Sequence, residues 1–154
     1  MEVADILGHD AVRASLKVQS KKRLFQEIAQ IVADTHGLSE QKILDALLER
    51  ENLGPTGVGH GVAIPHARIP DINKVLGVFI RLETAVDFEA VDRKPVDLIF
   101  VLLAPNAAGA EHLKALARVS RTLRDEQLCA KLRSTEDVTA LYAILTDTSA
   151  SQAA

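Results

Sequence analysis

Aromatic side chains are scarce in this sequence, which has no tryptophan, one tyrosine and an aromatic share of 3% in 154 residues. Apolar residues still make up 47%, so the core must be built from Leu, Ile, Val and Ala. The single cysteine, Cys129, excludes an internal disulfide and is typical of a reducing compartment. Its helical surroundings, EQLCAKLR, indicate a small buried side chain rather than a reactive thiol.

Long apolar runs and concentrated positive charge are also lacking. The longest apolar run, LIFVLLA, is far shorter than the roughly 20 residues of a membrane-spanning helix, so direct membrane insertion is not expected. The start, MEVADILGHD, lacks the basic and apolar parts of a secretory signal, which predicts a cytoplasmic protein. With a net charge of −3 and scattered Lys and Arg, no basic stripe is available for nucleic acid.

The length of 154 residues predicts one domain, over residues 1–147, and the small polar residues TSASQAA predict a flexible tail at 148–154. Hydrophobic periodicity predicts an α/β fold. Residues 96–104 are apolar almost throughout, as in a central strand covered by helices on both faces. We therefore expect a three-layer α/β/α sandwich around a mixed sheet of four to five strands. Further strands are expected at 12–18 and 75–82. Two helices are expected after the caps Ser20 and Ser39, the first ending at Gly37 and the second near Arg50. Further helices are expected at 110–123, around 128–132, and after a capping box formed by Ser134 and Asp137.

The segment GVGHGVAIPHARIP, residues 57–70, reads as a glycine-rich loop of fixed shape. Within it His66 follows Pro65, whose ring fixes φ, and precedes the small Ala67. An imidazole on such a stiff and uncrowded backbone suits a nucleophile. A histidine that is merely hydrogen-bonded in a loop is the alternative from residue type alone.

Other residues would complete an anion pocket around His66. His112 lies in the first turn of its helix, where backbone N–H groups and the helix dipole favour an anion. Arg50 offers a guanidinium that holds phosphoryl oxygens. Neutral donors are available at Thr56, Gly57 and Gly59. Taken singly, these residues more often have ordinary roles: His112 as a solvated surface residue, Arg50 as a helix-end charge paired with Glu49 or Glu51, and Thr56 as a turn residue.

A metal site is the weaker alternative reading of the same histidines. His60 and His66, with His112 or an acidic residue, have the chemistry to bind a transition metal. Their spacing matches neither HExxH nor a CxxC pattern, and GxSxG, GxGxxG and GxxxxGK[ST] motifs are missing from the sequence.

Three stretches together resemble the IIA proteins of the bacterial phosphoenolpyruvate phosphotransferase system. They are LLERENLGPTGVGHGVAIPHARIP, GVFIRLETAVDFEAVDRKPVDLIFVLLAP and EHLKALARVSRTLRD, and the resemblance runs from about Ala11 to Asp147. The chain looks like the fructose and mannitol type, and most like the stand-alone nitrogen-regulatory member. The resemblance implies a phosphotransferase component whose AIPH histidine, His66, takes a phosphoryl group on Nε2. The family's second histidine falls on His112 and its arginine on Arg50.

The resemblance also implies partners. The donor would be an HPr-like phosphocarrier charged by an enzyme I-type protein, and neither a cofactor nor a metal is needed. Two outputs stay open: regulation of target proteins in nitrogen, carbon or potassium metabolism, or transfer to the IIB domain of a sugar permease. Two positions depart from the family pattern. Pro55 replaces a common Ser. His60 replaces Asn, Thr or an acidic residue, which suggests a further hydrogen-bond donor to the phosphoryl group or a pH-responsive loop.

Overall fold

A computed structural model describes residues 1–147. The predicted flexible tail, 148–154, lies outside the described residues, and the domain boundary at residue 147 stays a prediction. In chain order the elements are η1 (Val3–Asp5), β1 (Leu7–Leu16), α1 (Lys21–His36), α2 (Glu40–Asn52), β2 (Gly57–Gly59), β3 (Val62–Ala63), β4 (His66–Ile69), β5 (Leu76–Val86), β6 (Val96–Pro105), α3 (Ala110–Arg124), α4 (Glu126–Arg133) and α5 (Val138–Thr146).

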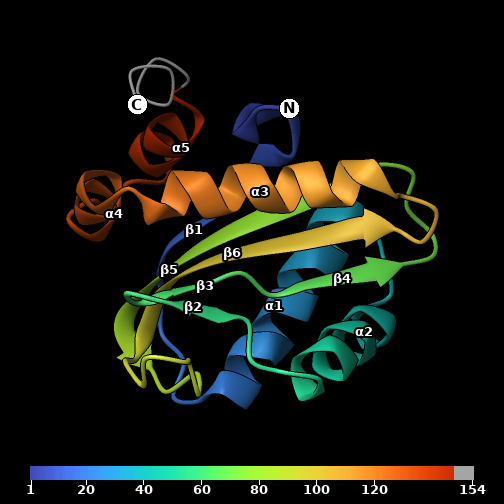
Figure 1. Cartoon of the computed structure of the whole chain (residues 1–154), viewed down its shortest axis with the longest axis horizontal. Coiled ribbons are helices and arrows are strands. Elements are labelled where there is room, and N and C mark those ends of the chain that lie inside the picture. Colours follow the sequence, from blue (N-terminus) through green and yellow to red (C-terminus); the bar gives the residue numbers. More distant parts are fainter. Residues whose placement is uncertain (148–154) are drawn as a thin grey trace.

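The helices cover both faces of a mixed sheet. Figure 1 shows α3 across one face and α1 with α2 across the other. The strand order is β1-β5-β6-β3-β2, and β4 pairs with β6 beyond the end of β3. Strands β1 and β5 are parallel, β5 and β6 antiparallel, and β3 and β4 both run parallel to β6. The predicted three-layer α/β/α sandwich is confirmed.

The strand count exceeds the four to five that we expected, because the glycine-rich segment 57–70 is not a plain loop. It contains β2, β3 and β4. Glycine and proline weaken the local strand signal, but the open edge of β6 supplies hydrogen-bond partners to β3 and β4 in turn. The first strand also begins earlier than predicted, at Leu7 rather than Val12. Its pairing with β5 is interrupted between these two residues, and this irregularity hides the alternation of apolar and polar residues in the sequence.

Local capping signals fix most helix ends. The side chains of Ser20 and Ser39 accept backbone N–H groups at the starts of α1 and α2, and Gly37 ends α1 with a φ of 68°. These three predictions are confirmed, although α2 runs two residues past Arg50. The last helix begins differently from the prediction. Asp137 alone is its N-cap, whereas Ser134 ends α4 and donates its hydroxyl to a carbonyl of that helix.

The middle of the core is β6, as its apolar sequence predicts. All residues from Val96 to Ala104 are buried except Asp97, which is half-buried and bound by Arg133. Phe100 packs against Phe79 of β5, with ring centroids 6.3 Å apart. Each large apolar side chain buried in this way stabilises the fold by about 1.5–3 kcal/mol. Within residues 1–147 no helix combines the length and the apolar character needed to cross a bilayer.

Candidate functional site

His66 is held at the first position of β4. The N–H of Leu102 on β6 donates to the carbonyl of Pro65, at 2.9 Å, and so fixes the backbone immediately before the imidazole. The ring nitrogen Nδ1 lies 2.8 Å from the carbonyl oxygen of Ile64. A carbonyl can only accept, so Nδ1 carries the proton and donates. The neutral ring is left with an unprotonated Nε2 that has a free lone pair.

His112 faces His66 from the first turn of α3. The two ring centroids are 5.6 Å apart and the planes are inclined at 68°. Only 8% of His112 is exposed, and its Nε2 is buried with no hydrogen-bond partner among the described residues. Burial lowers the pKa of His112, and positive charge at His66 and Arg68 lowers it further. His112 is therefore a buried neutral imidazole with an unsatisfied ring nitrogen beside the candidate nucleophile, and not a solvated surface residue.

The N-terminus of α3 adds a set of backbone donors. No side chain caps it, since Gly109 is the N-cap residue. The backbone N–H groups of a first turn have no partner within the helix, and the helix dipole places partial positive charge there. His112 belongs to this turn, so an anion held between the two imidazoles would lie close to these N–H groups.

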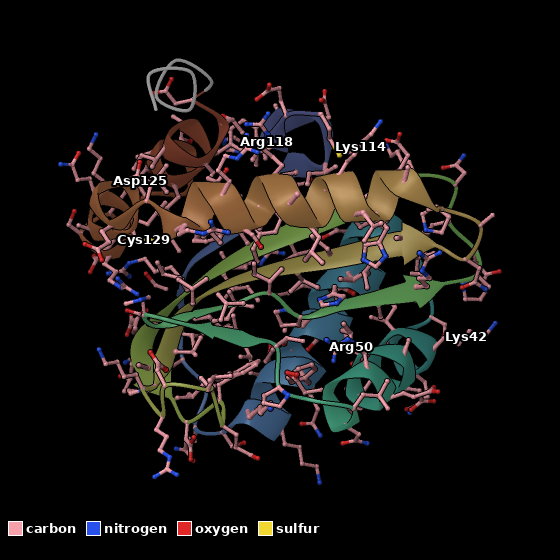
Figure 2. The ribbon with its side chains drawn as sticks, viewed as in Figure 1. Lys42, Arg50, Lys114, Arg118, Asp125 and Cys129 are labelled. Atoms are coloured by element: carbon pink, nitrogen blue, oxygen red, sulfur yellow. The ribbon has the colours of Figure 1, made fainter. Side chains whose placement is uncertain are left out.

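Arg50 approaches the site from α2, which packs against β4. Figure 2 shows Arg50 on the side of α2 that faces this strand. The guanidinium is half-buried, and one of its nitrogens, Nη1, donates to the carbonyl of Gly54 at 2.9 Å. The other N–H groups of the guanidinium stay available for a bidentate contact.

Thr56 is buried and already engaged. Its backbone N–H and its hydroxyl both donate to the carboxylate of Glu51, with the shortest contact at 2.7 Å. A hydroxyl has one proton, so Thr56 cannot donate to a phosphoryl oxygen while this contact lasts. The suggested pairing of Arg50 with Glu51 is also replaced, because Glu51 points inward to Thr56.

The two candidate glycines lie along β2. Gly57 pairs with Ala63, and a Cβ at this position would come within 2.7 Å of the Cβ of Ala90. Gly59 has a φ of 97°. Both positions require glycine for backbone reasons, namely close packing at the first and a left-handed conformation at the second.

His60 lies away from His66. It forms the β2–β3 turn with Gly61, and both residues have positive φ, as a two-residue type I′ turn requires. Val62 pairs with Leu98 and His66 with Leu102, so four residues of β6, roughly 13 Å at strand spacing, separate them, and His60 lies still further out. The nearness in sequence that suggested a role for His60 in the anion pocket is not kept in space.

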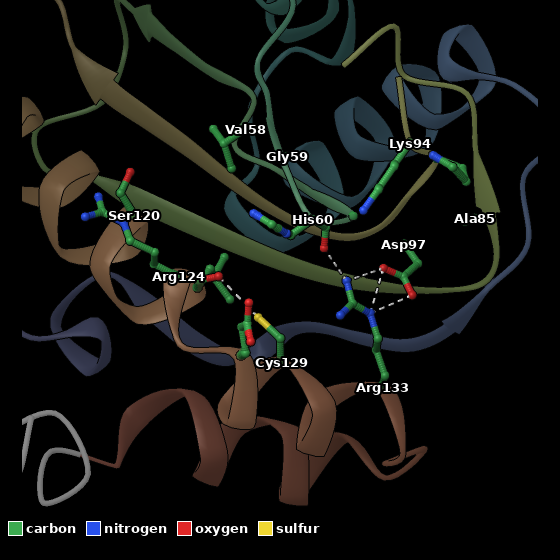
Figure 3. Close-up of a pocket in the computed structure, with 14 residues that line it drawn as sticks. Val58, Gly59, His60, Ala85, Lys94, Asp97, Ser120, Arg124, Cys129 and Arg133 are labelled. Atoms are coloured by element: carbon green, nitrogen blue, oxygen red, sulfur yellow. Dashed lines mark hydrogen bonds and ion pairs between the residues drawn. The ribbon is translucent and has the colours of Figure 1, made fainter. Parts of the chain in front are cut away.

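His60 instead lines a cavity of about 740 Å³ between the hairpin and the ends of α3 and α4. Figure 3 shows Arg133 in this cavity, donating to both oxygens of Asp97 and to the carbonyl of His60. Cys129 also lines it and is buried, with its thiol donating to a backbone carbonyl, and burial raises the pKa of this thiol. The prediction of a buried, unreactive cysteine agrees with this environment.

Sequence reasoning missed two residues near the site. Arg68 follows His66 by two positions on β4 and so shares its face of the strand, and it bonds the carbonyl of Asn106 in the segment before α3. Because side chains alternate between the two faces of a strand, Arg68 could have been placed beside His66 once β4 is recognised as a strand. Glu51 gave no signal, because a charged residue at a helix end usually faces solvent.

This arrangement suits anion chemistry. An imidazole with a free Nε2 stands beside a neutral imidazole in the uncapped first turn of α3, and the guanidinium of Arg50 is borne by α2, the helix that packs against β4. Among residues 1–147 no group of three His, Cys, Asp or Glu side chains is placed to hold a metal ion. A nucleophile with hydrogen-bond donors for a phosphoryl or similar group is one arrangement that this geometry can supply.

Comparisons with known proteins agree with this reading. Residues 5–148 match the model of the family described as phosphoenolpyruvate-dependent sugar phosphotransferase system, EIIA 2. A nitrogen regulatory protein of Bradyrhizobium diazoefficiens is 48% identical over 145 residues, which cover 94% of this chain and 95% of that protein. A fructose-specific EIIA component of Haloferax volcanii is 41% identical over 104 residues, 68% of each chain. The crystal structure of the nitrogen regulatory protein IIA-Ntr from Neisseria meningitidis superimposes with a TM-score of 0.88 at 38% identity, and the match covers 94% of this chain and 99% of that one. The chain therefore belongs to the EIIA type 2 family of the phosphoenolpyruvate-dependent phosphotransferase system.

Proposed function

We propose that this protein is a phosphoryl carrier that forms a phosphohistidine at Nε2 of His66. The observation that carries the proposal is the 2.8 Å hydrogen bond from Nδ1 of His66 to the carbonyl of Ile64. It leaves Nε2 as the unprotonated nitrogen, on the ring that faces His112. The proposed donor is an HPr-like phosphocarrier with its own phosphohistidine, charged from phosphoenolpyruvate by an enzyme I-type protein.

The transfer is a direct displacement at phosphorus. The lone pair of Nε2 on His66 forms the new N–P bond, and the N–P bond of the donor breaks with its electron pair returning to the donor imidazole. Such transfers pass through a loose, in-line transition state with negative charge on the three equatorial oxygens. The protein mainly positions the nucleophile and supplies donors to that charge.

We propose three sources of hydrogen bonds to the phosphoryl oxygens: Nε2–H of His112, the guanidinium of Arg50 and the first-turn N–H groups of α3. Burial of His112 without a partner supports this role, because a buried polar atom that lacks a hydrogen bond is costly unless a ligand satisfies it. Gly57 and Gly59 contribute backbone shape in this proposal. Thr56 contributes through its contact with Glu51.

Exposed apolar side chains adjoin the site and fit a protein donor. Leu113, next to His112, is 67% exposed, and Leu53, shortly after Arg50, is 82% exposed. Apolar side chains of this kind form the centres of protein interfaces. A partner that carries a histidine at the centre of its own apolar patch would bring that histidine to His66.

The proposed output is regulation: the phosphorylated and unphosphorylated forms bind different target proteins. The identity of 48% to a nitrogen regulatory protein over almost the whole of both chains supports it. The second candidate output is transfer to a sugar-permease IIB domain, which the similarity to a fructose-specific EIIA component favours.

The test is intact mass after incubation with phosphoenolpyruvate, an enzyme I-type protein and an HPr-like carrier. We expect the wild type to gain one acid-labile phosphoryl group and His66→Ala to gain none. The exposed histidine His9 is the matched control, and His9→Ala should behave as the wild type. Absence of any gain in the wild type, or a gain that persists in His66→Ala, would refute the proposal.

A second experiment separates the outputs. The phosphorylated protein is mixed with purified fructose-type and mannitol-type IIB domains, and loss of the phosphoryl group is followed by mass. Regulation predicts no transfer to either domain. Transfer on the timescale of charging would establish the sugar-transport output instead.

A further inference from the structure

The carboxylate of Glu51 is buried in the turn between α2 and β2. Its side chain is 6% exposed, a rare condition for glutamate outside ion pairs. Both carboxylate oxygens accept the backbone N–H of Thr56 at 2.9 Å, and the Thr56 hydroxyl donates to one of them at 2.7 Å. A buried charge is tolerated only with such compensation, so this position is built around a carboxylate.

Lys21 completes the environment of Glu51. Its ammonium lies 3.6 Å from a carboxylate oxygen of Glu51, donates to the carbonyl of Phe88 at 3.0 Å and sits 4.5 Å from the centre of the Phe88 ring. The start of α1 and the end of α2 are thereby tied together. Two charges with several partners hold one geometry better than a single surface pair does.

Hydrogen bonds lead from Glu51 to the candidate nucleophile. The carbonyl of Thr56 accepts the N–H of Ile64 at 3.0 Å, and the carbonyl of Ile64 accepts Nδ1–H of His66 at 2.8 Å. Pro65 has no N–H, so the backbone hydrogen bonds of this stretch run through the N–H of Ile64 on one side and the carbonyl of Pro65 on the other. We call the three residues Glu51, Thr56 and Ile64 the carboxylate link.

We propose that Glu51 is a positioning residue for phosphoryl transfer: through the carboxylate link it fixes the Ile64 carbonyl that holds His66 in the Nδ1–H form. The proposal rests on the proposed function for its kinetic part. Its structural part, control of the His66 tautomer, stands without any phosphoryl donor.

Glu51→Gln is the direct test, because it keeps the size and removes the charge. Its NH2 group would replace one of the two oxygens that accept from Thr56, and the negative charge beside Lys21 would be lost, so the contact should weaken. Long-range ¹H–¹⁵N spectra at high pH, where imidazole is neutral, distinguish the two tautomers of His66. We expect the share of the Nε2–H tautomer to rise several-fold, and phosphoryl acceptance to slow roughly tenfold because less of the nucleophile is correctly oriented.

Two control variants separate positioning from stability and from charge. Leu47→Ala leaves a cavity under the same helix and lowers the melting temperature without touching the carboxylate link. Glu49→Gln removes an exposed charge from the same helix end. Both should keep the wild-type tautomer ratio. A Glu51→Gln protein with the wild-type ratio and a rate no lower than that of Leu47→Ala would overturn the proposal.

Thr56→Val provides the measurement if Glu51→Gln does not fold. It removes only the hydroxyl donor and keeps the backbone N–H contact, so the tautomer shift should be smaller and in the same direction. An unchanged ratio would count against the link. Should the wild type accept no phosphoryl group while the tautomer still responds to Glu51, the proposed function fails and the link stands.

Discussion

The imidazoles of His66 and His112 face one another across 5.6 Å between ring centroids, although one belongs to a sheet strand and the other to a helix. His66 has its Nδ1 bound to a carbonyl, and His112 has its Nε2 buried without a partner. In the proposed function the first ring would act as the nucleophile and the second as a hydrogen-bond donor. The approach of a phosphoryl group would satisfy both.

Removal of His112 should slow transfer without preventing it. In His112→Ala we expect phosphoryl acceptance to fall by roughly 10²-fold, the usual effect of losing one donor to a transition-state oxygen. His112→Gln, whose amide N–H can replace Nε2–H, should lose less. The rate of mass gain with an HPr-like donor measures both variants. A wild-type rate in His112→Ala would remove His112 from the site.

His112 should also make stability depend on pH. Burial, followed by positive charge at His66 and Arg68, lowers its pKa below the ordinary value of 6.5. The unfolded chain therefore takes up a proton before the folded protein does. The free energy of unfolding should be unaffected by this group above about pH 6.5, and should fall as pH drops from there toward the lowered folded-state pKa.

Urea unfolding on both sides of this range tests the pH dependence. His112→Gln should lose less stability than the wild type when the pH is lowered from about 7.5 to about 5.5. His36, whose pKa is also lowered mainly by burial, contributes in the same direction, so the double variant with His36→Gln should be flatter still. Identical pH profiles for the wild type and His112→Gln would contradict the assignment.

Local chemistry made much of the fold predictable. Ser20, Ser39 and Gly37 are residues whose side chain, or lack of one, satisfies a helix end within a few positions, so the sequence shows them directly. The buried strand β6 is equally visible, because an apolar run of that length has to be covered on both faces. The sequence also indicates the start of the last helix, but Asp137, and not Ser134, is the residue that caps it.

Long-range pairing hid the rest. The short strands β2, β3 and β4 form because β3 and β4 pair with the edge of β6. The local pattern of glycine and proline does not reveal this pairing. The meeting of His66 with His112 depends on β4 lying beside β6, the strand that leads into α3. Motif resemblance pointed to both histidines, but their distance and the inward turn of Glu51 follow from tertiary packing alone.

Replacement of His60 should affect the turn and leave the proposed chemistry unchanged. At a φ of 57°, His60 occupies the first position of a type I′ turn, where asparagine is favoured. His60→Asn should leave the free energy of unfolding equal or raise it by a few tenths of a kcal/mol, because asparagine tolerates the left-handed region. The pH profile of phosphorylation should stay as in the wild type. A shifted profile would restore the hypothesis of a pH-responsive loop.

Gly61→Ala should cost more stability than Gly37→Ala, although both glycines have positive φ, 79° and 68°. A Cβ at Gly37 meets nothing within 4 Å. Alanine there should therefore lose only the stability that a left-handed conformation costs, about 1 kcal/mol. At Gly61 the Cβ would come 2.5 Å from Nη2 of Arg133, the atom that donates to the His60 carbonyl.

Because Arg133 must move to admit that Cβ, Gly61→Ala should lose about 1–2 kcal/mol beyond the loss in Gly37→Ala, as expected for a displaced charged hydrogen bond. Urea unfolding of the two variants measures the difference. Adding Arg133→Met to each completes a double-mutant cycle: the extra loss at Gly61 should disappear in that background, while the loss at Gly37 should be unchanged. An excess that survives without Arg133 would place the strain in the hairpin backbone or in the contact with Asp97, whose Oδ1 lies 3.1 Å from the same Cβ.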